Sequence, residues 1–281
     1  MKKFCVLEQG KYVEHEITVR KKDLYTSDIS DYYRFNWFTD EDPLADLTKK
    51  DAGENTLRWA QGRNFLFEKV KKDYEYFIFM DEDVEVKTYP EKKHDKEKIL
   101  NTIYDFLEEW NPIAAVAHTV NVWGVNGGES LSKEMAESGK PKCIKKHDAC
   151  MSVLRKSFAE RVFPIKHDGS DLCSAYQQWL ASEYYPNKFM FVPKIFSINA
   201  IEEQHHHTDD RKDEWRLRVI NGFADELIDS SKWLSNFTKD GYWKSQELLS
   251  DCEPSKEIVE ATDKQFSQIF KQVNDTPTEN Q

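Results

Sequence analysis

The feature that most constrains the fold is a short apolar run that ends in acidic residues. Residues 76–80 read Tyr-Phe-Ile-Phe-Met and are followed directly by Asp81, Glu82 and Asp83. Five consecutive apolar residues without polar alternation are typical of a strand that is buried on both faces of a sheet. We therefore predict a strand from Tyr74 to Val86, within a sheet that helices cover on both sides.

The rest of the first 200 residues alternates between strand and helix patterns, which favours an α/β fold. The apolar spacing predicts a helix over Lys96–Trp110, and Asn111-Pro112 ends the pattern. We expect a mixed, mainly parallel sheet with helices on both faces. The other expected strands cover 12–19, 32–38, 113–122, a short stretch after Asp148, and the residues from Phe189. The other expected helices cover about 56–70, 155–162 and 171–185, and 124–132 is expected to be a loop.

The expected domain organisation is one domain over residues 1–210 and a helical extension over 211–281 that packs on it. The extension contains an amphipathic pattern near Trp215–Leu227 and another near Ile258–Val273. From about Asn274 the chain is polar, and we expect this tail to be frayed.

Composition excludes several classes of protein. The 281 residues are 39% hydrophobic and 13% aromatic, which favours a folded chain. The net charge of −11 opposes binding to nucleic acid phosphates, so we expect no nucleic acid partner.

Hydropathy and cysteine usage bear on the cellular location. The apolar runs are much shorter than the roughly 20 residues that a membrane span needs, so we expect no transmembrane segment. Peripheral association with a membrane is compatible with this sequence. The five cysteines are scattered and form no CxxC pair. We therefore expect free thiols and a cytoplasmic location.

The acidic strand end predicts a site for a metal-bound ligand. Ligands of open α/β sheets gather at the carboxyl ends of strands. Mg²⁺ and Mn²⁺ prefer oxygen ligands and commonly combine one or two carboxylates with phosphate oxygens of the substrate. Alternation along a strand places Asp81 and Asp83 on one side and Glu82 on the other. The alternative interpretation is an acidic turn that is simply solvated.

At this point the sequence resembles the GT-A glycosyltransferases, whose fold is Rossmann-like. The segment GRNFLFEKVKKDYEYFIFMDEDVEV, residues 62–86, is similar to their Arg-Asn helix followed by a strand with a DxD motif. Residues 155–158 and FMFVPKIFSIN, residues 189–199, resemble later segments in the same order. The resemblance covers about residues 55–210, and the surface-polysaccharide and viral-glycan transferases look nearest. It departs at the start, because the strand that usually opens the fold is not evident.

The resemblance implies roles for residues around the acidic strand end. Asp83 would bind the metal, and Asp81 would contact the ribose or a metal-bound water, with Glu82 beside the nucleotide-sugar. Arg63 and Asn64 would lie at the nucleotide end, where a guanidinium pairs with phosphate or stacks on a base. An exposed pair of helix residues is the alternative for Arg63 and Asn64.

A histidine run and a further aspartate complete the predicted donor site. In the family a histidine after a late strand completes the metal site, and His206, in the middle of the run 205–207, is the nominal choice here. A surface cluster is the alternative for the run. Asp148 would face the sugar, although burial beside a strand is equally ordinary for it.

Asp171 is the predicted general base, which would take the proton of the acceptor hydroxyl and lead to inversion at the anomeric carbon. A helix N-cap fits the same residue, and nearby Asp168 is another choice for the base. The predicted enzyme moves a sugar from a nucleoside-diphosphate donor to a hydroxyl of a glycan, glycoprotein or glycolipid, with Mn²⁺ or Mg²⁺ as cofactor.

Two other functions remain open from the sequence. A non-catalytic protein of the same fold would bind a carbohydrate or a nucleotide-sugar without turnover. A Mg²⁺-dependent nucleotidyltransferase also needs acidic residues, but the Gly-rich phosphate loop that such enzymes use is not visible near the start of the chain.

Overall fold

The computed structural model describes residues 2–10, 15–53, 59–70, 73–120, 128–145, 150–165, 180–182, 184–199 and 249–258. The strands are β1 (Phe4–Gly10), β2 (Ser30–Asn36), β3 (Leu47–Thr48), β4 (Tyr76–Asp81), β5 (Val84–Thr88), β6 (Ala114–Thr119), β7 (Met151–Arg155) and β8 (Phe189–Asn199). The helices are α1 (His15–Tyr25), α2 (Trp59–Lys69), α3 (Lys96–Trp110), α4 (Gly128–Ser138) and α5 (Lys156–Val162), with a 3₁₀ turn over Lys49–Ala52.

The strands form one mixed sheet in the order β3-β2-β1-β4-β7-β6-β8-β5. Parallel pairings join β1 to β2 and β4, β2 to β3, and β6 to β8. Antiparallel pairings join β7 to β4 and β6, and β5 to β8. The predicted α/β fold with a mixed, mainly parallel sheet is confirmed.

The sheet curls, and the acidic turn lies where it does so. Only Glu82 and Asp83 separate β4 from β5, and three Cα steps of 3.8 Å reach about 11 Å at most. In a flat sheet the four spacings between these strands would measure about 19 Å. An irregularity in the β6–β8 register at Ala117/His118 accommodates part of the bend.

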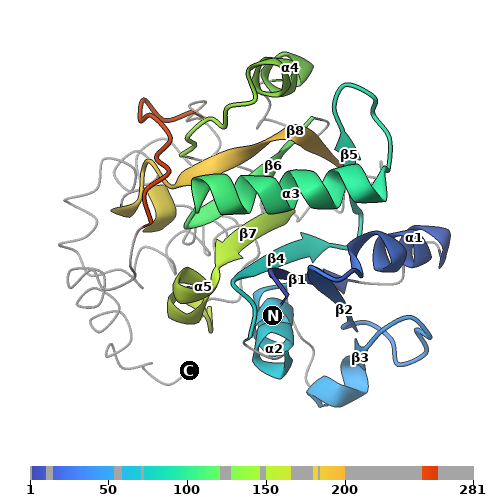
Figure 1. The fold of residues 1–281 in the computed structure, drawn as a ribbon. Coiled ribbons are helices and arrows are strands. Elements are labelled where there is room, and N and C mark those ends of the chain that lie inside the picture. The colour runs from blue at the N-terminus through green and yellow to red at the C-terminus, as the bar shows by residue number, and fades with distance from the viewer. Residues whose placement is uncertain are drawn as a thin grey trace, which may run out of the picture.

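Helices cover both faces of the sheet, as the continuous apolar strands predicted. Alternate residues of β4 point to opposite sides: Phe77 and Phe79 belong to the core under α2 and α5, whereas Ile78 and Met80 belong to the core under α3. Figure 1 shows α3 lying across the second of these faces with α1 beside it. Both cores are rich in aromatic side chains.

Four local predictions need correction. The opening strand is present as β1, in the interior of the sheet between β2 and β4. Residues from His15 form helix α1 instead of a strand, and Gly128–Ser138 forms helix α4 instead of a loop. The strand expected over Tyr74–Val86 is two strands with a turn at Glu82 and Asp83. The predicted helix Lys96–Trp110 is confirmed at both ends.

The described piece of the C-terminal region, residues 249–258, packs on the domain without forming a helix. Ser250 N donates to Cys143 O at 2.9 Å, and Leu249 bridges to Ile144. The amphipathic patterns at 215–227 and, apart from Ile258, at 258–273 lie outside the described residues. None of the described helices combines the length and apolarity needed to span a bilayer.

Lys188 anchors this C-terminal piece from inside the protein. Its buried Nζ donates to Trp110 O at 2.7 Å and to Ser255 O at 2.8 Å. Burial lowers the pKa of Lys188 to about 8, from an ordinary value of 10.5. The unfolded chain therefore binds more protons than the folded chain between these pH values, and the free energy of unfolding rises with pH there.

Replacing Lys188 by Met is expected to remove this pH dependence. Urea unfolding from pH 8 to pH 10.5 should show a steeper rise in stability for the wild type, with Lys188 contributing at most about 1.4 kcal/mol per pH unit. Lys256→Met, at an exposed lysine of the C-terminal piece 249–258, should keep the wild-type slope. Equal slopes in the wild type and Lys188→Met would contradict the burial of a titrating ammonium.

Candidate functional site

The candidate site lies where β1 and β4 end side by side. The two strands are parallel and adjacent, with Gln9 paired to Asp81. Helix α1, which follows β1, contributes Leu24 and Tyr25 to one core, whereas α2, which precedes β4, packs in the other. The connections thus leave the sheet on opposite faces, which defines a topological switch point, where open α/β sheets bind ligands.

Asp81, the last residue of β4, is held in a fixed orientation at this point. Its Oδ1 accepts from Trp59 Nε1 at 2.9 Å and from Arg63 Nη2 at 3.0 Å. Its backbone N–H donates to Cys150 O at 2.9 Å. Among the described residues none donates to Oδ2, and the side chain keeps 20% of its exposure. One carboxylate oxygen is therefore oriented by protein and the other can face a ligand.

Arg63 orients Asp81 instead of lying on the surface. Its guanidinium is 1% exposed and lies 3.7 Å from the centroid of the Trp59 ring. Trp59 and Arg63 are four residues apart on α2, so they share a helix face. Because the guanidinium is buried against Trp59 and Asp81, the structure gives Arg63 a positioning role. Contact with a nucleotide, which the sequence suggested for Arg63, stays a prediction.

The electrostatics of Asp81 favour a cation beside it. Burial raises the pKa of Asp81 to about 7, Arg63 acts to lower it, and the charges of Asp83 and Glu82 raise it further. A carboxylate is costly in such surroundings unless positive charge lies close to it. Two further acidic residues, Glu82 and Asp83, follow this carboxylate directly, so negative charge is concentrated at the strand end.

Gly10, at the end of β1, leaves room for the acidic turn. A Cβ at Gly10 would lie 2.1 Å from the Glu82 Cδ and Oε2 atoms and 2.5 Å from the Glu82 Cβ. The Glu82 side chain thus lies directly against the Gly10 backbone. Since the Cβ of Glu82 moves only with the main chain, any side chain at Gly10 must displace the turn itself.

Gly10→Ala must move the turn, so it is expected to weaken the metal-dependent nucleotide binding that the sequence predicts. We expect a loss of about 10- to 100-fold in metal affinity, the range seen when the groups that orient metal ligands are disturbed. Calorimetric titration with Mn²⁺ and a nucleoside diphosphate measures it. Lys133→Ala, at an exposed lysine of α4, is the control. A wild-type Mn²⁺ affinity in Gly10→Ala would show that the position of the turn does not matter for metal binding.

Asp83 provides a second carboxylate in the turn. It makes no hydrogen bond or ion pair with any residue that the structure describes, and it is partly exposed. The described residues hold no cluster of three His, Cys, Asp or Glu side chains with metal-binding geometry. Asp83 and Asp81 Oδ2 nevertheless fit a Mg²⁺ or Mn²⁺ ion whose remaining ligands are phosphate oxygens and water.

The other predicted site residues are not brought to this point by the described structure. The Asn64 amide donates to Ile165 O at 2.7 Å and accepts from Ile165 N at 2.7 Å, so both ends of the amide fix that segment and do not reach out toward a nucleotide. Asp148, Asp171 and His206, with its neighbours in the run 205–207, lie outside the described residues. Their roles stay predictions.

Sequence reasoning missed three residues of the site, namely Trp59, Gly10 and Lys21 of α1, whose Nζ donates to Glu82 O at 2.6 Å. Trp59 could have been found, because a Trp one helical turn before Arg63 is placed to stack on it. Gly10 could be recognised as part of the site only after β1 is known to be a strand that ends there. Lys21 gave none, since it lies in a run of basic residues that reads as solvated.

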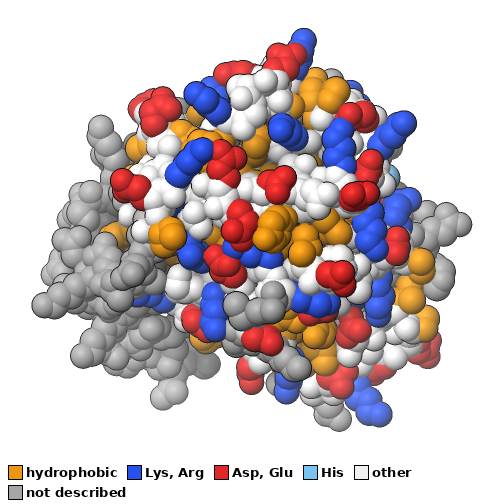
Figure 2. All heavy atoms as spheres, viewed as in Figure 1, with side chains coloured by type: hydrophobic (Ala, Val, Ile, Leu, Met, Phe, Trp, Pro, Cys, Tyr) orange, Lys and Arg blue, Asp and Glu red, His pale blue; other side chains and the backbone are white. Residues whose placement is uncertain are grey.

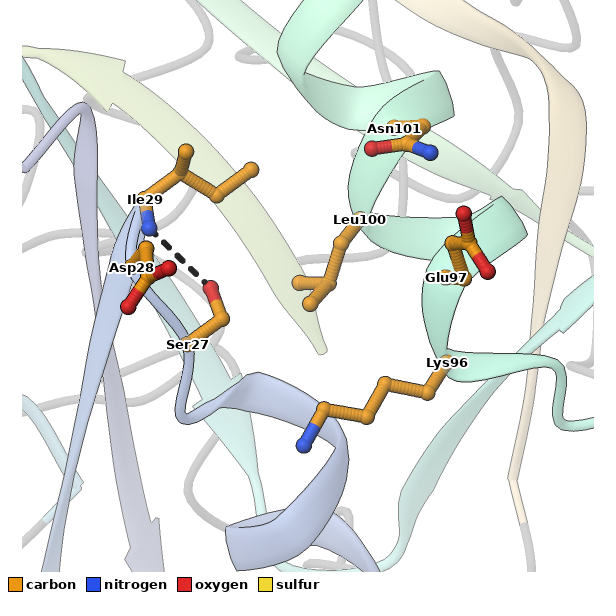
Figure 3. A pocket seen from close by; sticks show the side chains of 7 residues that line it. All are labelled: Ser27, Asp28, Ile29, Lys96, Glu97, Leu100 and Asn101. Atoms are coloured by element: carbon orange, nitrogen blue, oxygen red, sulfur yellow. Dashed lines mark hydrogen bonds between the residues drawn. The ribbon is translucent and has the colours of Figure 1, made fainter.

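A hollow near the amino end of β2 does not belong to this site. It has a volume of about 340 Å³ and lies between the turn before β2 and the start of α3 (Figure 3). Its residues are Ser27, Asp28, Ile29, Lys96, Glu97, Leu100 and Asn101. Figure 2 shows the face over α3, where positive and negative side chains are interspersed as on an ordinary solvated surface.

Comparison with known proteins gives structural neighbours only. No protein-family model and no curated protein matches the sequence. A glycosyltransferase involved in the glycosylation of the major capsid of PBCV-1 has a TM-score of 0.41 and 13% identity, over 72% of this chain and 95% of that one.

Two further neighbours are also glycosyltransferases. The apo form of GlyE from Streptococcus pneumoniae TIGR4 has a TM-score of 0.37 and 12% identity, over 89% of this chain and 66% of that one. The bifunctional WbbM has a TM-score of 0.34 and 10% identity, over 85% of this chain and 51% of that one. The chain thus spans about two thirds of GlyE and half of WbbM. The identities and TM-scores of these neighbours are too low to indicate the function of this chain, which has to follow from its own residues.

Proposed function

We propose that this protein is a metal-dependent glycosyltransferase of the GT-A kind that uses a nucleoside-diphosphate sugar. The observation that carries the proposal is the arrangement at the end of β4. Asp81 is oriented there by Trp59 and Arg63, and Asp83 has no partner among the described residues. Both lie at the switch point between β1 and β4, where a diphosphate can approach the sheet edge.

The chain's residues hold the donor and its metal in this proposal. Asp83 and the free oxygen of Asp81 bind Mn²⁺ or Mg²⁺, and His206 is proposed as a third protein ligand. The bound ion supplies positive charge that offsets the charge developing on the departing diphosphate. Trp59 and Arg63 keep Asp81 in one rotamer, which fixes where the donor diphosphate lies. Glu82, packed on Gly10, is placed at the nucleotide side of the turn.

The acceptor side of the proposal rests on residues outside the described part of the chain. Asp171 takes the proton of the acceptor hydroxyl, and Asp148, two residues before Cys150, faces the donor sugar. A single displacement with this base inverts the anomeric carbon. Proton NMR of the product, read at the anomeric coupling, tests the stereochemistry, and retention would exclude Asp171 as the base of a direct displacement.

The proposed acceptor is a hydroxyl of a glycan, glycoprotein or glycolipid, and the proposed location is the cytoplasm. None of the described cysteines, Cys5, Cys143, Cys150 and Cys252, forms a disulfide with another described residue, which supports a reducing compartment. The fifth, Cys173, lies outside the described residues.

Thermal stabilisation by nucleotide-sugars tests donor binding and names the donor class. At about 100 times its dissociation constant, a ligand that binds only the folded state adds roughly 2.7 kcal/mol of stability. We expect one nucleotide family to stabilise the protein with Mn²⁺ and not with EDTA. Binding without turnover would favour the non-catalytic alternative, and turnover of a nucleoside triphosphate to pyrophosphate would favour a nucleotidyltransferase. No stabilisation by any nucleotide-sugar would contradict the proposal.

A further inference from the structure

Lys21 of α1 reaches beneath the acidic turn from the face opposite Arg63. Its side chain is 3% exposed. Its Nζ donates to Glu82 O at 2.6 Å and to Asp81 O at 3.2 Å. The third neighbour of Nζ is Glu8 Oε2, at 2.8 Å. Both hydrogen bonds of the Nζ therefore go to main-chain carbonyls of the turn, whereas the contact with Glu8 Oε2 is an ion pair without hydrogen-bond geometry.

Lys21 is itself held by a buried charge network. Glu8, on β1, is fully buried and also pairs with Arg34 on β2. Arg34 Nε in turn donates to Asp42 Oδ2 at 3.1 Å. Buried charges of this kind persist only when they are paired and hydrogen-bonded. The ammonium therefore has one defined position, and a flexible lysine is converted into a rigid support.

Two supports from opposite faces thus fix different parts of the same strand end. Arg63 and Trp59 hold the carboxylate of Asp81, whereas Lys21 holds the carbonyls of Asp81 and Glu82. The Lys21 contacts fix the peptide planes on both sides of Glu82, and the backbone after Glu82 leads directly to Asp83. A change at Lys21 therefore alters where the Asp83 carboxylate points without touching that carboxylate.

We infer that Lys21 is a positioning residue for the acidic turn, and that it sets the affinity of Asp81 and Asp83 for the divalent ion and its diphosphate. This inference rests on the proposed function. The competing explanation is that Lys21 only balances the charge of Glu8 and stabilises the fold. The two explanations differ in one respect, because only the positioning role lowers metal affinity in a protein that remains folded.

The test compares Lys21→Met, the double variant Glu8→Gln/Lys21→Met and the control Lys22→Met. Lys22 is the exposed neighbour on α1, 3.4 Å from Asp46. The double variant removes both charges of the buried pair, so it supplies a folded protein even where Lys21→Met alone is too unstable. Free Mn²⁺ is followed by EPR in titrations with UDP, GDP, CDP and ADP in turn, at a temperature where circular dichroism shows each variant folded.

We expect Mn²⁺ affinity in the presence of the preferred diphosphate to fall about 10- to 100-fold in Lys21→Met, the range for groups that orient metal ligands. The double variant should show the same loss, and Lys22→Met should match the wild type. Wild-type affinity in the folded double variant would overturn the inference while leaving the proposed function intact. A wild-type protein with no diphosphate-dependent Mn²⁺ binding would overturn both.

Discussion

Asp83→Asn is expected to abolish most of the proposed metal-dependent activity while leaving the fold unchanged. Asp83 makes no hydrogen bond or ion pair with the described residues, so the substitution removes a charge that the fold does not use. An amide is a poor ligand for Mn²⁺ or Mg²⁺ compared with a carboxylate. We expect the turnover number to fall by about 100- to 1,000-fold, as when one electrostatic group that acts on a transition state is lost.

Steady-state kinetics across a Mn²⁺ series measures this effect. Asp23→Asn is the matched control, because the Asp23 side chain is 77% exposed on α1 and has no contact with the turn. Neither variant should unfold at a lower temperature than the wild type. If Asp83→Asn kept the wild-type rate and Mn²⁺ dependence, the metal would have to be bound elsewhere.

Arg63→Met is expected to damage both stability and donor binding. The substitution leaves Asp81 without its cation in an enclosed site, and breaking a buried ion pair costs about 3–5 kcal/mol. We expect the lower end of this range because the Asp81 side chain keeps 20% exposure. Arg63 also lowers the pKa of Asp81, so its loss should raise that pKa further and leave Asp81 largely protonated near neutral pH.

Urea unfolding and the pH dependence of diphosphate binding together test this prediction. Binding to Arg63→Met should recover as pH rises, because deprotonation of Asp81 restores its charge, whereas wild-type binding should change less over the same range. Lys69→Met, at an exposed lysine of α2, is the control for changes to the helix. Arg63→Met with wild-type stability would mean that Arg63 and Asp81 are not paired.

Helix α3 shows what the sequence could predict. Its apolar residues recur at helical spacing, Asp95 caps its start by accepting from Lys98 N at 3.0 Å, and Asn111 takes a left-handed conformation at its end. All of these signals are local. They agree with one another, and the predicted ends were correct.

Strand β1 shows what the sequence could not predict. Its apolar run is interrupted by Glu8 and Gln9, which look like solvent-exposed residues. Both are buried and partly paired by other elements: Lys21 and Arg34 form ion pairs with Glu8, and Gln9 Nε2 donates to Trp59 O at 2.9 Å. The few β-branched residues of 12–19 predict a strand where helix α1 begins. Tertiary packing of Leu24 and Tyr25 decides otherwise.

The site was predictable only in part, because some of it depends on local patterns and the rest on tertiary contacts. The strand end with Asp81 and Asp83 is a local pattern, and the structure places it at the switch point. Trp59 and Arg63, which hold the Asp81 carboxylate, come from α2. Lys21, which holds the main chain of the turn, comes from α1. Only the topology, in which β1 lies beside β4, brings these segments together.

The most direct test of the account is release of nucleoside diphosphate from nucleotide-sugars by purified protein, measured with Mn²⁺ and with EDTA. Wild-type protein and Asp83→Asn are assayed with and without a mixed glycan acceptor. We predict that one nucleotide-sugar releases its diphosphate in the wild type with Mn²⁺, and that chelation or Asp83→Asn removes the release. Release that is equal with EDTA, or equal in Asp83→Asn, would contradict a metal-diphosphate site at the end of β4.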